Sequence, residues 1–132
     1  MSMEEQRKLA AEETYKNDRA HVIHSWSVQS KVKPIVIDKA EGCYFWDGNG
    51  KRYLDMYSQI VNLNIGHQHP KVVKAIQDQA GKLCYAAPSL AVDARSTLGK
   101  LMSEVTPEGL NHFFFTNGGA DANENAVKIA KM

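Results

Sequence analysis

Cysteine is scarce in this sequence, whose 132 residues contain only Cys43 and Cys84. The two lie far apart and have no metal-like spacing, which disfavours both a disulfide framework and a zinc ribbon. An excess of one charge is also lacking, because 16 Lys and Arg oppose 15 Asp and Glu, for a formal net charge of +1. This balance excludes a polycationic nucleic-acid binder and an acidic tail protein. We therefore expect no nucleic-acid partner.

Long apolar runs are missing as well. No stretch approaches the ~18 consecutive apolar residues that a membrane-spanning helix needs. The first residues, Met1–Glu5, are polar and acidic, unlike a signal peptide. A length of 132 residues is enough for one domain with a core. We expect a cytoplasmic α/β protein with reduced cysteines and no membrane partner.

The sequence of the N-terminal region is compatible with two structures. Residues 1–16 are rich in Glu, Lys, Gln and Ala, and Leu9, Ala10 and Tyr15 form a weak apolar stripe. A short helix and an arm that becomes ordered only on a partner are equally compatible with this composition. Trp26 follows in a polar segment, where a lone tryptophan is more typical of a packing anchor than of a ligand contact.

Three short runs after Pro34 predict β-strands. They are Ile35–Asp38, Cys43–Trp46 and Lys51–Asp55. Residues 40–42 should break the first strand, and the Asp-Gly-Asn-Gly sequence of residues 47–50 is a strong hairpin-turn signal. The pattern indicates a small antiparallel meander.

Residues 56–65 fit neither a plain strand nor a plain helix. The run is apolar but is interrupted by polar side chains, namely Ser58, Gln59, Asn62 and Asn64. Buried amides need hydrogen-bond partners, so these side chains are either bonded within the protein or face a ligand.

The remainder predicts three helices and a strand. Pro70 suits the first turn of a helix, a second helix runs from about Ala91 until Pro107 ends it, and a third begins at Ala120. The apolar run His112–Thr116 is typical of a strand buried on both faces, as at the start of a βαβ unit. Since no parallel neighbour follows and the helical pattern continues to Met132, we expect a truncated domain. A self-contained small α+β domain is the alternative.

The junction between this strand and the third helix is the main candidate site. Its glycines permit a tight turn and a close approach to a ligand. The free N–H groups and the dipole of the following helix favour an anion, typically phosphate. An ordinary tight turn is equally compatible with residues 117–121. The junction matches neither a Walker A loop nor Gly-x-Gly-x-x-Gly.

Other chemistry has weaker support. His67 and His69 have no evident third ligand, so we expect no metal site and interpret them as turn and helix-entry residues. No catalytic triad is readable. Asp121 and Glu124 share a helix face, where we expect them to be solvated or to pair with Lys128.

Three motifs, in this order, resemble class III aminotransferases. Gly42–Asp55 resembles their opening hairpin, Asn64–Val73 their Gly-His-x-His-Pro segment, and Phe114–Glu124 their cofactor-phosphate loop. The resemblance implies an α/β fold, the N-terminal portion of a fold type I enzyme dependent on pyridoxal 5'-phosphate (PLP). It further implies transfer of an amino group between an amine or amino acid and a keto acid, by a homodimer.

The resemblance also assigns roles to residues. The implied phosphate contacts are Gly118, Gly119 and Ala120, mainly through backbone N–H groups. The implied substrate contacts are Trp26, Ile60, Val61 and Tyr85. The family's Schiff-base lysine would lie after Met132, so we expect no catalytic residue within this chain. The identity of the amino donor stays open.

The resemblance divides the chain into three parts. Residues 1–33 would form an N-terminal arm, residues 34–66 the meander of the small domain with a crossover segment, and residues 67–132 the start of the PLP-binding large domain. The alternative function is a non-catalytic module that binds phosphate or serves assembly, including assembly with a separate chain that holds the rest of an enzyme.

Overall fold

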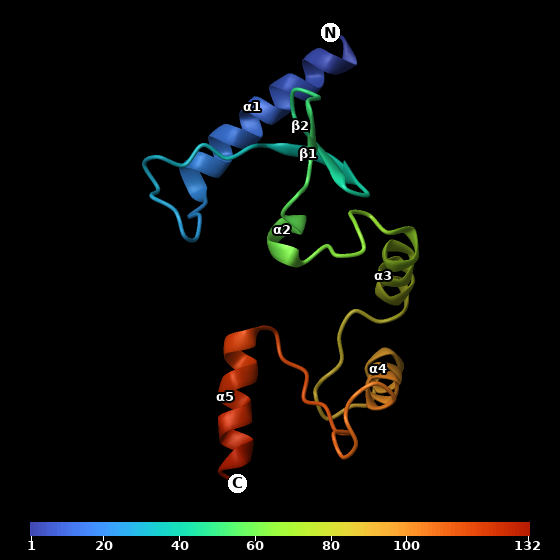
Figure 1. Ribbon diagram of the computed structural model, residues 1–132. Coiled ribbons are helices and arrows are strands. Elements are labelled where there is room, and N and C mark those ends of the chain that lie inside the picture. Colours follow the sequence, from blue (N-terminus) through green and yellow to red (C-terminus); the bar gives the residue numbers. More distant parts are fainter. The chain divides into compact units, whose positions relative to one another are not determined.

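The structure is a computed structural model that describes residues 1–132. It divides into two compact units, Met1–Lys82 and Leu83–Met132 (Figure 1). The elements of the first unit are α1 (Met3–His21), β1 (Ile37–Glu41), β2 (Tyr44–Asp47), β3 (Arg52–Leu54), α2 (Ser58–Val61) and α3 (Pro70–Lys82). Those of the second unit are α4 (Asp93–Ser103) and α5 (Gly119–Ala130). The domain limits at residues 33/34 and 66/67 stay predictions.

Helix α1 confirms the helical alternative for the N-terminal region and extends it to His21. A capping box starts the helix. The Glu5 backbone N–H donates to the Ser2 hydroxyl at 3.2 Å, and the Ser2 N–H donates to the Glu5 carboxylate at 2.6 Å. Each bond satisfies a donor that the first turn would otherwise leave without a partner.

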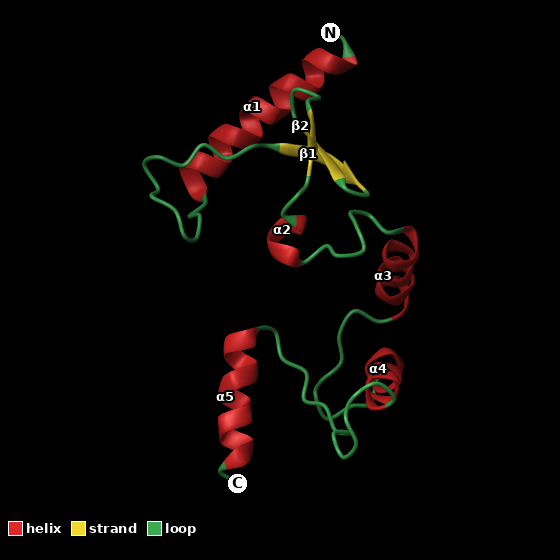
Figure 2. Ribbon diagram, viewed as in Figure 1, coloured by secondary structure: helices red, strands yellow, loops and turns green.

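The predicted meander is confirmed. β1, β2 and β3 form one antiparallel sheet in that order (Figure 2). The first strand begins at Ile37 rather than Ile35, however, and it includes Ala40 and Glu41, which we predicted to break it. Ala40 pairs with Phe45, so cross-strand pairing overrides its low strand propensity. The break falls at Gly42, where φ is +56°.

The hairpin turn is organised by the Asp47 carboxylate. Its Oδ1 accepts hydrogen bonds from the N–H groups of Asn49 and Lys51, each at 2.9 Å, and its Oδ2 accepts one from the Tyr53 hydroxyl at 3.0 Å. Burial acts to raise the pKa of Asp47, but the bonds from Lys51, Tyr53 and Asn49 outweigh it and hold the pKa below its usual value. The carboxylate therefore links the turn to β3.

The predicted helix starts are confirmed to within two residues. α3 begins at Pro70, α4 at Asp93, and α5 at Gly119, one residue before the expected Ala120. α4 ends at Ser103, before Pro107, and the Thr106 hydroxyl then contacts the Met102 and Leu110 carbonyls in the following turn.

The predicted strand at residues 112–116 is wrong. The segment is not part of the sheet, and the side chains of Phe114 and Phe115 are 67% and 43% exposed. A parallel strand is stabilised by its neighbours rather than by its own sequence, and β1–β3 all belong to the other unit. The apolar run alone therefore does not produce a strand here.

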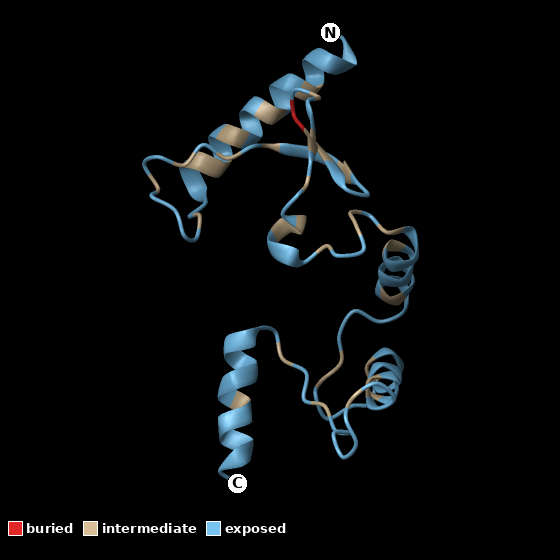
Figure 3. Ribbon diagram, viewed as in Figure 1, coloured by how far each residue is buried: buried red, intermediate tan, exposed pale blue.

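Most residues of both units are exposed (Figure 3), and many large apolar side chains are among them. Neither unit buries an apolar side chain, and buried residues are confined to the hairpin turn at Asp47 and Gly48. Trp26 is 88% exposed, so its interpretation as a packing anchor is wrong. Both cysteines are exposed and form no disulfide. None of the helices combines the length and the hydrophobicity needed to cross a bilayer.

Candidate functional site

The N-terminus of α5 presents unsatisfied backbone donors. Gly118 is the N-cap in an extended conformation, with φ −166° and ψ 167°, and no side chain caps the helix. Its carbonyl accepts from the Ala122 N–H at 3.0 Å, whereas the N–H groups of Gly119, Ala120 and Asp121 make no hydrogen bond. Because the helix dipole is positive at this end, these donors suit an anion such as phosphate.

The space beside these donors is open. A Cβ atom built on Gly119 would meet nothing within 4 Å, and one on Gly118 would meet only the Asp121 carboxylate, at 4.0 Å. The Thr116 hydroxyl donates to the Gly118 carbonyl at 3.2 Å and so braces the loop without occupying the donors. Uncapped donors and free space together fit the phosphate group of PLP.

Ion pairing on α5 follows the expected pattern. The Lys128 ammonium lies 2.7 Å from the Glu124 carboxylate, and both side chains are about two-thirds exposed. A pair this exposed contributes little to stability. We assign it no part in the candidate site.

The segment at residues 56–65 forms an unusual turn. All residues of α2 have positive φ, from +46° at Ser58 to +63° at Ile60. This left-handed conformation costs residues other than glycine roughly 1–2 kcal/mol each, so it persists only where surrounding contacts impose it. The conformation explains why the run fitted neither a plain strand nor a right-handed helix.

Two amide side chains of this segment have partners within the protein. The Gln59 amide donates to the Asp55 carboxylate at 3.1 Å, and the Asn62 amide donates to the Gln59 carbonyl at 2.9 Å. We expected these amides either to be bonded within the protein or to face a ligand, and the first explanation holds for Gln59 and Asn62. Ile60 and Val61 are 46% and 70% exposed, which leaves them available to a ligand.

His67 has a partner through its side chain, and His69 through its backbone carbonyl. His67 Nε2 lies 2.7 Å from the Asp55 carboxylate, and the His69 carbonyl accepts from the N–H groups of Val72 and Val73 at the start of α3. The expected turn and helix-entry roles are confirmed. No three His, Cys, Asp or Glu side chains gather in a geometry suited to a metal ion.

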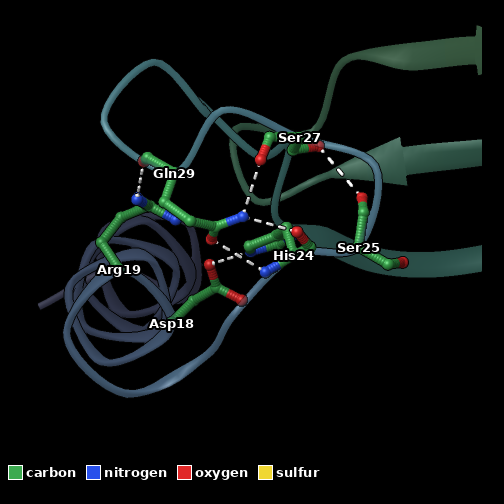
Figure 4. Close-up of polar contacts among 6 residues, drawn as sticks. All are labelled: Asp18, Arg19, His24, Ser25, Ser27 and Gln29. Carbon is green, nitrogen blue, oxygen red and sulfur yellow. Dashed lines mark hydrogen bonds and ion pairs between the residues drawn. The ribbon is translucent and has the colours of Figure 1, made fainter.

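Trp26 lies between α1 and β1, in a segment whose neighbouring residues make the polar contacts drawn in Figure 4. Asp18 contacts His24 Nε2 at 2.7 Å, and the Gln29 amide spans the loop to both the N–H and the carbonyl of His24. The Arg19 guanidinium donates to the Gln29 carbonyl. Trp26 itself has φ +55° and an accessible side chain.

The predicted substrate contacts fall in both units. Trp26, Ile60 and Val61 belong to Met1–Lys82, and Ile60 and Val61 share one turn. Tyr85 belongs to Leu83–Met132, where it is 78% exposed in a loop. Sequence analysis missed Asp55, which contacts both Gln59 and His67. The one signal in the sequence that pointed to Asp55 was that the Gln59 amide, in an apolar run, needs a hydrogen-bond partner.

Comparison with known proteins shows the family to which this chain belongs. The model of the family "Aminotransferase class-III" matches residues 25–132. An acetylornithine aminotransferase from Archaeoglobus fulgidus is 34% identical over 114 residues, which cover 86% of this chain and 29% of that protein. The chain belongs to the class III aminotransferase family, as its three motifs predicted.

Solved structures show the same similarity. A taurine:2-oxoglutarate aminotransferase from Bifidobacterium kashiwanohense, in complex with PLP and glutamate, is 43% identical with a TM-score of 0.85, covering 92% of this chain and 27% of that chain. An (S)-enantioselective omega-transaminase from Thermomicrobium roseum is 35% identical with a TM-score of 0.85, covering 91% and 28%. The predicted fold class, that of the fold type I PLP-dependent transferases, is confirmed. The chain spans about 30% of the length of these relatives.

Proposed function

We propose that the whole protein is a PLP-dependent aminotransferase that moves an amino group between an amine or amino acid and a keto acid. The observation that carries the proposal is the uncapped, glycine-flanked N-terminus of α5 in a chain of the class III family. The proposal includes a homodimer in the cytoplasm, acting on small molecules and not on nucleic acid or membranes.

In this proposal the phosphate of PLP is held by backbone N–H groups of Gly118, Gly119 and Ala120. The three groups make no hydrogen bond within the protein, and the dipole of the 12-residue helix α5 adds to their attraction for an anion. When bound, PLP supplies the electron sink for amino transfer, while the protein binds and orients it. This part of the chain therefore serves binding.

Substrate contacts are proposed for Trp26, Ile60, Val61 and Tyr85. All four side chains are accessible, between 46% and 88% exposed. Their apolar and aromatic character suits the non-reacting part of a substrate, since ligand sites are lined mainly by such side chains. Residues 1–33, 34–66 and 67–132 are proposed as the arm, the small-domain part and the large-domain part.

The phosphate assignment is tested by Gly119→Val in the whole protein. Open space around Gly119 accepts the new side chain, so a loss of PLP would reflect the ligand rather than a clash within the protein. We expect PLP to dissociate at least about tenfold faster during dialysis, which corresponds to ~1.4 kcal/mol if association is unchanged. Gly99→Val is the matched control, because Gly99 is also helical and also has open space around it.

Amino transfer is tested with a panel of donors and 2-oxoglutarate. The panel contains acetylornithine, taurine and a small (S)-amine, which are chosen from the names of the similar proteins. Formation of glutamate from at least one donor supports the proposal. Binding of PLP without transfer from any donor would favour the non-catalytic module instead. Equal PLP retention by the Gly119→Val and Gly99→Val proteins would contradict the phosphate site.

A further inference from the structure

Asp55 and His67 form the most enclosed contact between an acidic and a basic side chain in the chain. Their side-chain atoms lie 2.7 Å apart and are only 4% and 11% exposed. The remaining pairs are at least 25% exposed on both sides. Polar groups this enclosed are costly unless they are well partnered, so their contacts define a specific geometry.

Backbone hydrogen bonds bring the two residues to the same turn of the meander. The Asp55 N–H donates to the Cys43 carbonyl at 2.8 Å, and His67 exchanges bonds of 2.8 and 3.1 Å with Gly42. Gly66 has φ +88°, and a Cβ there would lie 3.2 Å from the Gly42 carbonyl oxygen. These contacts hold the two ends of residues 56–66 close together. We call this segment the 56–66 loop.

The Asp55 carboxylate also contacts the interior of the 56–66 loop. Besides His67, it accepts from the Tyr57 N–H at 3.2 Å and from the Gln59 amide at 3.1 Å. Tyr57 and Gln59 lie on either side of the first left-handed residue, Ser58. One carboxylate thus links the base of the loop to the strained turn that carries Ile60 and Val61.

We infer that Asp55 and His67 are positioning residues that fix the left-handed turn, and through it determine which amino donors fit against Ile60 and Val61. This inference rests on the proposed function. Neither residue needs to contact the substrate. Their effect follows from the conformational cost of the turn, which relaxes when its contacts are removed.

The first test follows the loop itself by amide hydrogen exchange in the whole protein. The N–H groups of Val61, Asn62 and Leu63 donate to carbonyls of Tyr57 and Ser58, so they report on the turn. Asp55→Ala should accelerate their exchange about tenfold or more, since local opening sets this rate. Asp55→Asn, which keeps an acceptor, should restore part of the protection. The control, Asp78→Ala, removes the partner of Lys74 in an exposed pair on α3 and should change nothing in the loop.

The second test compares kcat/KM for a small and a large amino donor. Asp55→Ala should change their ratio about tenfold, mainly through KM, because a reshaped pocket alters binding of the non-reacting part of the donor. PLP retention should stay as in the parent. His67→Gln replaces the imidazole with an amide that keeps an N–H donor, and it provides the same comparison if Asp55→Ala does not fold.

The outcomes separate the inference from the proposed function. Unchanged exchange in Asp55→Ala and His67→Gln would overturn the inference, and so would accelerated exchange with an unchanged donor ratio in an active protein. A parent that transfers no amino group from any donor would overturn the proposed function, and the inference with it.

Discussion

Gly48 lies directly against Ala11, and a Cβ atom built on Gly48 would overlap the Cβ of Ala11. The turn between β2 and β3 therefore rests on α1. The Gly48 N–H donates to the Val36 carbonyl at 2.9 Å, which links the turn to the segment that enters β1. The close contact with α1, and not a left-handed backbone conformation, therefore favours glycine at position 48.

Gly48→Ala should weaken the contact between α1 and the hairpin. The new methyl group cannot be accommodated without moving Ala11, and overpacking of this kind costs typically ~1–3 kcal/mol. Amide exchange in α1 should accelerate accordingly. Ala11→Gly removes the opposing methyl group, so the double variant should recover much of the lost protection.

Gly99→Ala is the control for this prediction. Gly99 lies inside α4, and a methyl group added to it would meet nothing within 4 Å, so the substitution should be neutral or stabilising by up to ~1 kcal/mol. If Gly48→Ala behaves in the same way, the close approach of Gly48 to Ala11 is refuted.

The hairpin turn should lose stability only in strong acid. Because the pKa of Asp47 is lowered in the folded state, its contribution is complete above the ordinary aspartate value of about 3.9 and disappears as the pH falls through the lowered pKa. The N–H signals of Asn49 and Lys51, which donate to this carboxylate, should therefore titrate with a midpoint below about 3.9.

Asp47→Asn should remove this titration and weaken the turn at neutral pH, since the amide cannot reproduce all three contacts of the carboxylate. Asp38→Asn, on the exposed strand β1, should leave the signals of Asn49 and Lys51 unchanged. A midpoint above about 3.9 for these signals would show that burial outweighs the hydrogen bonds at Asp47.

Features set by neighbouring residues were predictable from the sequence. The hairpin follows from the turn residues at 47–50, and α3 and α5 follow from their start signals and apolar spacing. The run at 112–116 failed because a strand depends on pairing partners distant in sequence. The left-handed turn was also unpredictable, because residues such as Ile60 adopt it only under constraint from other segments.

The candidate site shows the same difference between local features, which the sequence predicts, and contacts between distant residues, which it does not. The uncapped start of α5 lies within one short motif, so local reasoning indicated residues 117–121 as an anion site or a tight turn, and the family resemblance then assigned the phosphate contacts to Gly118, Gly119 and Ala120. The role of Asp55 depends on His67, twelve residues away, and on a turn of the meander that brings both together. No spacing rule for helices or strands predicts such a pair.

Gly118→Ser should stabilise α5. Gly118 has the extended conformation of an N-cap but no side chain to cap the helix, and serine supplies an oxygen acceptor for the free N–H groups. Serine should exceed alanine at this position by about 1 kcal/mol and exceed glycine by a few tenths. Circular dichroism of peptides spanning residues 112–132 measures the difference as helix content. Equal helix content for the serine and alanine peptides would contradict the assignment of Gly118 as N-cap.

The 132-residue chain, studied by itself, should associate. Neither unit buries an apolar side chain, and apolar residues on every longer helix are accessible, including Ile76 at 64% and Leu101 at 53%. Exposed apolar surface of this kind favours association or partial unfolding. Size-exclusion chromatography with light scattering should show oligomers or aggregates, and thermal unfolding should lack a sharp transition. Ile76→Lys should reduce the association more than Gln77→Lys, which adds the same charge to the same helix at an exposed polar position. A sharp monomeric peak with cooperative unfolding would instead support a self-contained domain.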